Sequence, residues 1–370
     1  MHNEPLGVYI HIPFCLQKCR YCDFCSVAGS SEGLRAAYVQ RLVCEIRTAS
    51  DKGRAVDTVF FGGGTPSLLS PSEITAVMDA VRDTFSVTTD AEITVEANPA
   101  TLTDAFLDAC CTSGVNRFSL GLQSINENEQ KLLGRIHTTQ DFYDSMHLLH
   151  RHGFENVNVD IMYGIPDQTR ESLMRTVEAV LSVEPTHVSA YSLILEEGTQ
   201  LYRMRDTLVL PDEDAELAMH EALCERLAAS GFSRYEISNF CLDGYACRHN
   251  MKYWTMQPYI GFGAAAHSFL GDRRIEHSSD IGAYIRGEAP LSHAVTEADA
   301  RFEYAMLALR TSQGISLADY RRRFGVDFTE GRETLLERLR AMGYLVIDRE
   351  HVHFTECGMY VSNSLLTEIL

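Results

Sequence analysis

The chain has 370 residues, of which 45% are hydrophobic, and its 51 acidic and 32 basic side chains give a formal net charge of −19. This length suits one large domain with one or two smaller ones. The acidic balance, with no basic block along the chain, argues against a nucleic-acid partner. No apolar run of about 18 residues predicts a membrane span, and residues 1–6 are too short and too polar for a signal peptide. We therefore expect a cytoplasmic protein whose eleven cysteines stay reduced, which favours a metal site over disulfides.

Six strand-like runs alternate with amphipathic helical stretches over the first half of the chain. The strands are predicted at 7–12, 57–61, 91–96, 116–122, 156–161 and 186–193. The helices are predicted at 34–49, 71–84, 103–112, 139–152 and 170–183, with Ser70-Pro71 and Thr103 as helix starts. Strand and helix repeats of this kind predict a parallel sheet with right-handed crossovers. Six units are too few to close an eight-stranded barrel, so we expect an α/β fold built on an open (β/α)6 partial barrel.

The pattern changes after residue 211. A helix is predicted near 212–230 and a strand at 235–240, followed by a Gly- and aromatic-rich segment to about 290. Helices at 297–310, 316–323 and 331–342, short strands at 344–348 and 351–354 and a last helix indicate a small winged-helix-like domain. We predict three parts: a partial barrel over 1–215, a barrel-associated extension over 216–293 and a C-terminal domain over 294–370. Because the chain is acidic, the last part is expected to act as a lid or a docking unit.

Three cysteines follow the first predicted strand in the spacing Cys15-x-x-x-Cys19-x-x-Cys22. A cubane iron-sulfur cluster normally takes four cysteine ligands, so three cysteines leave one iron free to bind a small molecule. Zinc with His11 as a fourth ligand is the alternative. His11 lies inside the alternating strand, however, so the pleat sets the direction of its side chain. We interpret Cys15, Cys19 and Cys22 as ligands of a 4Fe-4S cluster.

The run from Tyr9 through the three cysteines resembles the signature of the radical S-adenosylmethionine (SAM) superfamily. In that superfamily the open iron binds the amino and carboxylate groups of SAM, and one electron passed through the cluster cleaves SAM to a 5'-deoxyadenosyl radical. The resemblance implies that Gly63, Gly64 and Thr65, which follow the second strand, hold the SAM amino group. It also implies that Tyr9 and Tyr21 touch the cofactor. A glycine run is alternatively a turn, and the tyrosines are alternatively core residues.

Further polar residues stand at or after the ends of the later strands. Glu96 ends the third strand, Gln123 follows the fourth, Arg135 comes next in a Leu-Gly-Arg sequence, and Asp160 lies near the end of the fifth. In barrel-type sheets this edge carries the chemistry. Any one of these residues is alternatively structural. Together they resemble the residues with which oxygen-independent coproporphyrinogen III oxidases hold a second SAM beside the first, and whether a second SAM binds here stays open.

A later element has the pattern His-Asn-x-x-Tyr-Trp and spans His249 to Trp254, the only tryptophan of the chain. It resembles the diagnostic element of the HemW-type heme chaperone family, close kin of the anaerobic coproporphyrinogen oxidases, in which this histidine is implicated in heme binding. An imidazole nitrogen is a natural axial ligand for heme iron, and aromatic side chains can cover the apolar face of the macrocycle. A histidine beside aromatics is alternatively a packing residue.

Two features favour a chaperone over an oxidase. The oxidases carry a fourth cysteine two positions after the third, and this chain has Phe24 at that place. The oxidases also have a long leader before the cluster motif, whereas only fourteen residues precede Cys15 here. The resemblance then implies heme as the ligand and a heme-acceptor apo-protein as the partner, with the cluster and SAM supporting transfer. An electron donor such as flavodoxin or ferredoxin is also implied. Cys25 departs from both patterns and is interpreted as a small residue, although a heme attachment is an alternative.

Several alternatives remain open at this stage. One is an oxygen-independent coproporphyrinogen III oxidase, which decarboxylates porphyrinogen propionates to vinyl groups by radical chemistry. Another is a radical SAM methyltransferase. Transient contact with a membrane protein and a homodimer are also open, because nothing in the sequence decides them.

Overall fold

Six parallel strands in chain order form the centre of the molecule. The structure is a computed structural model that describes residues 4–370. The six strands are β1 (Leu6–Ile12), β4 (Ala55–Gly63), β5 (Ser86–Ala97), β6 (Arg117–Gln123), β7 (Val157–Tyr163) and β8 (His187–Ser192). All six predicted strands are therefore confirmed, and they are adjacent in the sheet in the order of the sequence. Hydrophobic side chains from all six contribute to one large core.

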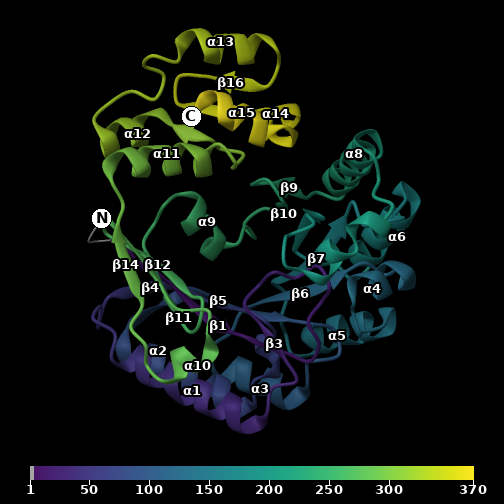
Figure 1. The fold of residues 1–370 in the computed structure, drawn as a ribbon, viewed down its shortest axis with the longest axis vertical. Helices are drawn as coiled ribbons and strands as arrows, with labels where there is room; N and C mark the ends of the chain where they lie inside the picture. The colour runs from purple at the N-terminus through teal and green to yellow at the C-terminus, as the bar shows by residue number, and fades with distance from the viewer. Residues whose placement is uncertain (1–3) are drawn as a thin grey trace.

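Helices connect these strands and cover the outside of the sheet (Figure 1). They are α1 (Glu32–Arg47), α2 (Pro71–Thr84), α3 (Asp104–Thr112), α4 (Glu127–Leu133), α5 (Thr139–Arg151), α6 (Arg170–Leu181) and α8 (Glu213–Ala229). Local chemistry fixes the predicted starts: Ser70 caps α2 in a capping box with Pro71 at the first position, and Thr103 caps α3. Together, the strands and helices confirm the open (β/α)6 partial barrel.

The sheet continues beyond the barrel strands on both sides and has twelve strands in all. Beside β1 lie one parallel strand and three antiparallel strands: β11 (Tyr259–Phe262), β12 (His267–Leu270), β13 (Arg273–Glu276) and β14 (Leu291–Ala294). Beside β8 lie β10 (Asn239–Cys241) and β9 (Ser233–Arg234), both in antiparallel pairs. The extension predicted at 216–293 thus supplies the edges of the barrel sheet. The predicted boundary at residue 215 falls inside α8, and both domain boundaries stay predictions.

The strand predicted at 235–240 is wrong at its centre. The chain turns back between β9 and β10, where the Tyr235 N–H donates to the Asn239 carbonyl at 3.1 Å. The buried carboxylate of Glu236 accepts the Ser238 N–H at 3.2 Å, and this bond holds the turn. A side-chain acceptor within the run gives the backbone a partner other than a neighbouring strand.

The C-terminal unit has its own hydrophobic core. Its elements are α11 (Glu297–Ala308), β15 (Ile315–Ser316), α12 (Leu317–Phe324), α13 (Glu333–Ala341), β16 (Leu345–Ile347), β17 (His351–Phe354), α14 (Glu356–Tyr360) and α15 (Ser362–Ile369). The three predicted helices and two wing strands are present, while β15 and the break between α14 and α15 were not predicted. Met256 and Phe269 of the extension join this core, so the unit packs on the extension.

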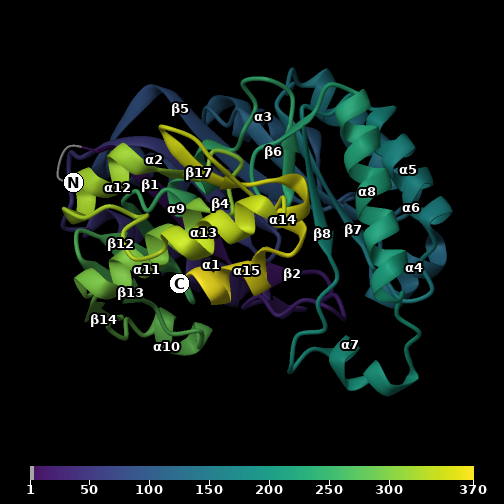
Figure 2. The same ribbon diagram turned by 90° about the horizontal axis from the view of Figure 1, so that it is seen from above.

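Seen from above, the C-terminal unit lies over the left half of the molecule, and α4, α5, α6 and α8 lie along its right edge (Figure 2). Short elements complete the chain: β2 (Phe14–Cys15), β3 (Val27–Ala28), α7 (Gln200–Arg203), α9 (Arg248–Trp254), α10 (Ile281–Ile285) and the 3-10 turns η1 (Pro66–Leu68) and η2 (Arg205–Thr207). Within residues 4–370, no helix is long and apolar enough to cross a membrane.

Candidate functional site

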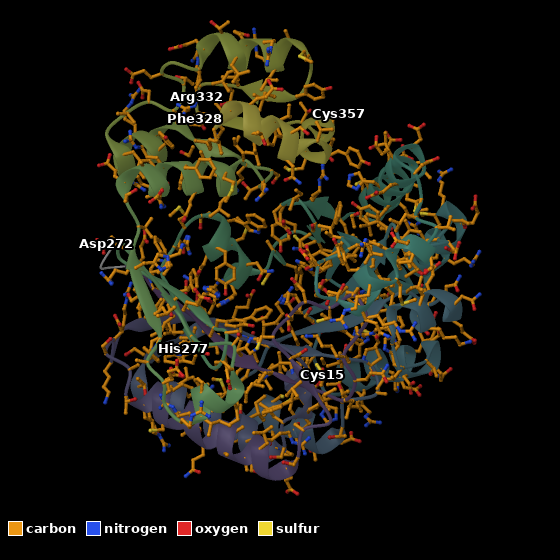
Figure 3. All side chains as sticks on the ribbon, in the orientation of Figure 1. Cys15, Asp272, His277, Phe328, Arg332 and Cys357 are labelled. Atoms are coloured by element: carbon orange, nitrogen blue, oxygen red, sulfur yellow. The ribbon has the colours of Figure 1, made fainter. Side chains whose placement is uncertain are left out.

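A cavity opens where the parallel strands end. The predicted site residues in its lining are Cys15, Cys19, Tyr21, Cys22, Gly63, Gly64, Thr65, Glu96, Gln123, Arg135 and Asp160. The topology therefore brings together residues that are up to 145 positions apart in the sequence. Figure 3 labels Cys15 in the lower half of the molecule, well separated from Phe328 and Arg332 of the C-terminal unit. Tyr9 and His249 lie outside the lining.

The cysteine loop is fixed at both ends. Cys15 ends β2, which pairs with β3 through Phe14–Val27 and Cys15–Ala28. Within the loop, the Arg20 N–H donates to the Leu133 carbonyl at 2.9 Å, which ties the loop to the end of α4. All three thiols are free of disulfides and line the same cavity. Three unpaired thiols on an anchored loop fit a cluster whose fourth iron is open.

The thiols do not form a site for a single ion. No group of three ligating side chains among residues 4–370 is arranged to hold one metal ion. A cubane cluster instead binds each cysteine to a different iron, so its ligands need not meet at one point. Burial, and to a smaller extent the neighbouring Cys19 and Cys15, raise the pKa of Cys22 to about 11. Binding of iron therefore displaces a proton from Cys22.

The glycine run lies directly under the cysteine loop. Gly63 has φ +106°, and a Cβ there would stand 2.4 Å from Cε1 of His11. A Cβ at Gly64 would stand 2.8 Å from the Ile12 carbonyl oxygen, so both positions need glycine for close packing against the end of β1. Thr65 Oγ1 donates to Cys15 Sγ at 3.6 Å. The run thus presents its backbone to the cavity next to the first cysteine.

Two carboxyl groups line the cavity from the ends of β5 and β7. Burial, and then the nearby Asp160, raise the pKa of Glu96 to about 8, although the Gly63 N–H donates to its Oε2 at 3.1 Å. Burial also raises the pKa of Asp160, whose Oδ1 accepts Asn158 Nδ2 at 2.7 Å. Carboxyl groups in such surroundings gain stability when a ligand donates hydrogen bonds to them. They are suited to hold amino or hydroxyl groups.

Arg135 and Gln123 add polar atoms that lack partners. Arg135 Nη1 donates to Cys19 Sγ at 3.4 Å and Nη2 to the Gly121 carbonyl, but its Nε is buried without a partner. Gln123 has φ +71°, a left-handed backbone that is rare for residues other than glycine, and its Oε1 is buried without a partner. Buried polar atoms are normally hydrogen-bonded, so these atoms are available to pair with a ligand in the cavity.

Sequence reasoning missed Asn98, which connects the two halves of the site. Its Oδ1 accepts Arg135 Nη2 at 2.6 Å, and its Nδ2 donates to Thr65 Oγ1 at 2.9 Å. Arg135, Thr65 and the cysteine loop are therefore one hydrogen-bonded unit. The available signal was position, because Asn98 stands two residues after Glu96 at the end of the same strand.

His249 lies in the barrel interior near the start of α9 and is 1% exposed. Its Nδ1 is hydrogen-bonded to Thr58 Oγ1 at 2.9 Å and its Nε2 to the Tyr253 hydroxyl at 2.8 Å, and its ring stacks on Phe60. Burial, and then the positive charge of Lys252, lower its pKa to about 3. Both ring nitrogens are therefore occupied, and heme ligation by His249 stays a prediction that requires its release from Tyr253.

Tyr9 lies between α9 and the cysteine loop. Its ring stacks on His249 with centroids 6.4 Å apart, and its hydroxyl is hydrogen-bonded to Nδ1 of His11 at 3.1 Å. Nε2 of His11 donates to the Cys25 carbonyl at 2.8 Å. The Cys25 thiol donates to the Ser279 carbonyl at 3.3 Å and does not line the cavity. Tyr9 therefore reaches the loop through His11.

Comparison with known proteins places this site in a family. The model of the Radical SAM superfamily matches residues 9–180, and that of the HemN C-terminal domain matches residues 295–361. Heme chaperone HemW of Lactococcus lactis is 34% identical over 100% of this chain and 98% of the relative, and that of Escherichia coli is 38% identical over 98% and 97%. The chain belongs to the HemW family. HemW of Bacillus subtilis, 33% identical over 98% and 99%, agrees.

Membership in the HemW family and the Radical SAM superfamily implies a 4Fe-4S cluster and SAM. The donor set fits both, because three free thiols and several unpartnered polar atoms line one cavity. A solved structure, coproporphyrinogen III oxidase (HemN) from Escherichia coli, has a TM-score of 0.86 over 99% of this chain and 90% of that chain, at 23% identity. At this identity the likeness shows that the two proteins share a fold.

Proposed function

We propose that this protein is a heme chaperone that binds heme and passes it to an acceptor protein. The observation that carries the proposal is full-length similarity, at 33–38% identity, to relatives named heme chaperone HemW. Phe24, where the related oxidases carry a fourth cysteine, supports it. The predicted cytoplasmic location, an electron donor of the flavodoxin or ferredoxin kind and an apo-protein acceptor belong to the same proposal.

In this proposal Cys15, Cys19 and Cys22 hold the cluster, and the residues around them bind SAM. The bound cluster and SAM would supply an electron path and a source of a carbon radical. The side chains proposed for SAM are Tyr21, Thr65, Glu96, Gln123, Arg135 and Asp160, with the backbone of Gly63 and Gly64 and with Tyr9 acting through His11.

Arg135 has a second task in this arrangement, because its guanidinium contacts both Cys19 and Asn98. Its positive charge offsets negative charge on the thiolate, and its fork holds the cysteine loop against β5. Glu96, Gln123 and Asp160 supply side-chain oxygen atoms that accept hydrogen bonds from donor groups of the ligand. Each of these residues binds or orients a ligand at a stated atom, and none needs to move a proton.

The test uses protein reconstituted with its cluster under anaerobic conditions, with SAM and a reductant. We expect one heme to bind per chain and to move to an added apo-heme protein, followed by absorbance. We also expect no conversion of coproporphyrinogen III to protoporphyrinogen IX. Catalytic amounts of vinyl product, detected by mass spectrometry, would instead establish the oxidase alternative.

A further inference from the structure

A turn directly after β5 holds the side chain of Asn98 in the wall of the cavity. The Asn98 carbonyl accepts two hydrogen bonds from Thr101, one from its N–H at 3.1 Å and one from its Oγ1 at 2.6 Å. Ala100, inside the turn, has φ +66°, and its N–H donates to Ser145 Oγ of α5 at 3.2 Å. Thr101 Oγ1 is also hydrogen-bonded to Ser67 Oγ at 2.6 Å. These contacts fix the turn and, with it, the place of the Asn98 amide.

The chemistry of its neighbours sets which way the Asn98 amide faces. Arg135 Nη2 donates to Asn98 Oδ1 at 2.6 Å, and a guanidinium has no atom that accepts a hydrogen bond. The amide oxygen must therefore face Arg135, so the amide nitrogen faces Thr65 and donates to its Oγ1 at 2.9 Å. Because the Thr65 oxygen accepts this bond, its own hydroxyl proton is directed to Cys15 Sγ, at 3.6 Å.

These contacts form a bridge between two cysteines of the loop. The bridge runs from Cys15 through Thr65, Asn98 and Arg135, whose Nη1 donates to Cys19 Sγ at 3.4 Å. Each end of the bridge thus donates a hydrogen bond to a sulfur atom, and Thr65 is only 2% exposed. Hydrogen bonds to the ligating sulfur atoms help to set the potential of an iron-sulfur cluster, because they stabilise the negative charge that reduction adds.

We propose that Asn98 is a positioning residue for the cluster. Its amide directs the Thr65 hydroxyl and the Arg135 guanidinium to the sulfur atoms of two cluster cysteines, which raises the reduction potential of the cluster. The inference rests on the cluster of the proposed function, but it does not depend on heme binding. Asn98 acts through its two neighbours, so its effect on the potential must disappear when the neighbouring hydroxyl is absent or turned away.

The test measures the reduction potential of the full-length, cluster-reconstituted protein without SAM. Dithionite and redox mediators set the potential, and electron paramagnetic resonance reports the reduced fraction. Thr65→Val removes the hydroxyl, and Thr65→Ser keeps it. Asn98→Asp keeps an oxygen for Arg135 but presents a second oxygen to Thr65, so the hydroxyl proton turns away from the sulfur. Thr112→Val is the matched control, because the exposed Thr112 hydroxyl donates within α3 to the Asp108 carbonyl.

We expect Thr65→Val to lower the equilibrium constant for one-electron reduction about tenfold, which corresponds to about 59 mV. Asn98→Asp should lower it at least as far, because the turned hydroxyl is joined by an added negative charge. In the Asn98→Asp background, Thr65→Val should have little further effect, since the hydroxyl no longer faces the sulfur. Thr65→Ser and Thr112→Val should keep the potential of the wild type.

The outcomes separate this inference from the proposed function. Equal potentials for wild type and Thr65→Val overturn the inference and leave the proposed function standing. A full effect of Thr65→Val in the Asn98→Asp background also overturns it, because the hydroxyl would then act without Asn98. If Thr65→Val holds no cluster, recovery of iron by Thr65→Ser supports the role of the hydroxyl, and equal failure of Thr65→Ser overturns it. Failure of the wild type to assemble a cluster removes the cluster from the proposed function itself.

Discussion

The cluster cavity and the interior around α9 contain similar polar side chains in different surroundings. Around α9 several of these groups meet one another: Glu92 accepts the backbone N–H of His249 at 3.1 Å, and Lys252 Nζ lies 2.7 Å from Asp57 Oδ1. In the cavity, Gln123 Oε1 and His137 Nε2 are buried without partners. The two regions are joined by Tyr9, which stacks on His249 and reaches the cysteine loop through His11.

This difference separates a binding region from a supporting one. A buried polar group without a partner costs about 1–3 kcal/mol, and in the cavity a bound ligand can recover that cost. The paired groups around α9 instead hold strands and helix together. The motif that carries His249 was predicted as a heme element, and that role stays a prediction; in the structure both ring nitrogens are hydrogen-bonded within the protein.

The largest effect is expected for Cys19→Ser in the cavity. Loss of one of three thiolates removes a cluster ligand and the partner of Arg135, so the variant should retain almost no iron after anaerobic reconstitution. Iron and sulfide assays measure the result. Cys25→Ser is the matched control and should keep full iron, because its thiol does not line the cavity. The opposite pattern would make Cys25 a ligand.

The second-largest effect is expected on the stability of the α9 interior. His249→Ala removes the stacking partner of Phe60 and leaves the hydroxyl groups of Thr58 and Tyr253 unpaired. We expect the free energy of unfolding to fall by about 3 kcal/mol, measured by urea denaturation. His150→Ala on exposed α5 should change it by less than about 0.5 kcal/mol. An equally small change for His249→Ala would show that its contacts are not structural.

A smaller effect is expected for Glu96→Gln in the cofactor-free protein, and this substitution should raise the free energy of unfolding rather than lower it. Because the folded pKa of Glu96 is raised to about 8, the unfolded chain releases its proton first, and stability falls as pH rises from about 4.5 to 8. Gln cannot ionise, so the variant should be more stable than wild type by about 2 kcal/mol at pH 6 and nearly equal to it at pH 4.5. Urea curves at the two pH values decide. A stability difference that does not depend on pH would contradict the origin of this effect in Glu96 ionisation.

The smallest effect is expected at the junction of the two regions. Tyr9→Phe removes one hydrogen bond to His11 and should lower the free energy of unfolding by about 1 kcal/mol. SAM affinity, measured by equilibrium dialysis, should fall by only about two- to threefold, because Tyr9 lies outside the cavity lining and acts on the site through His11. A large loss of SAM affinity would instead place Tyr9 in direct contact with the cofactor.

The sequence by itself determined the repeating part of this protein. Period, caps and strand composition are local, so the six strands, most of the connecting helices and the helix starts at Ser70 and Thr103 were readable from short windows. The cysteine spacing was equally local. Once the strands were assigned, the rule that parallel strands share one carboxyl edge was enough to bring Glu96, Gln123 and Asp160 toward the cysteines.

Only the tertiary structure decided which of these side chains are paired. His249 meets Thr58 across 191 positions, and Arg135 meets Cys19 across 116, and no local pattern reports such contacts. The edge strands β11 to β14 were not predicted for the same reason. A run of four residues forms a strand only when a neighbouring strand pairs with it. The sequence around His137 did not indicate that Nε2 of its ring lacks a hydrogen-bond partner either. A free nitrogen is a property of everything packed around a ring, and packing is settled when distant segments meet.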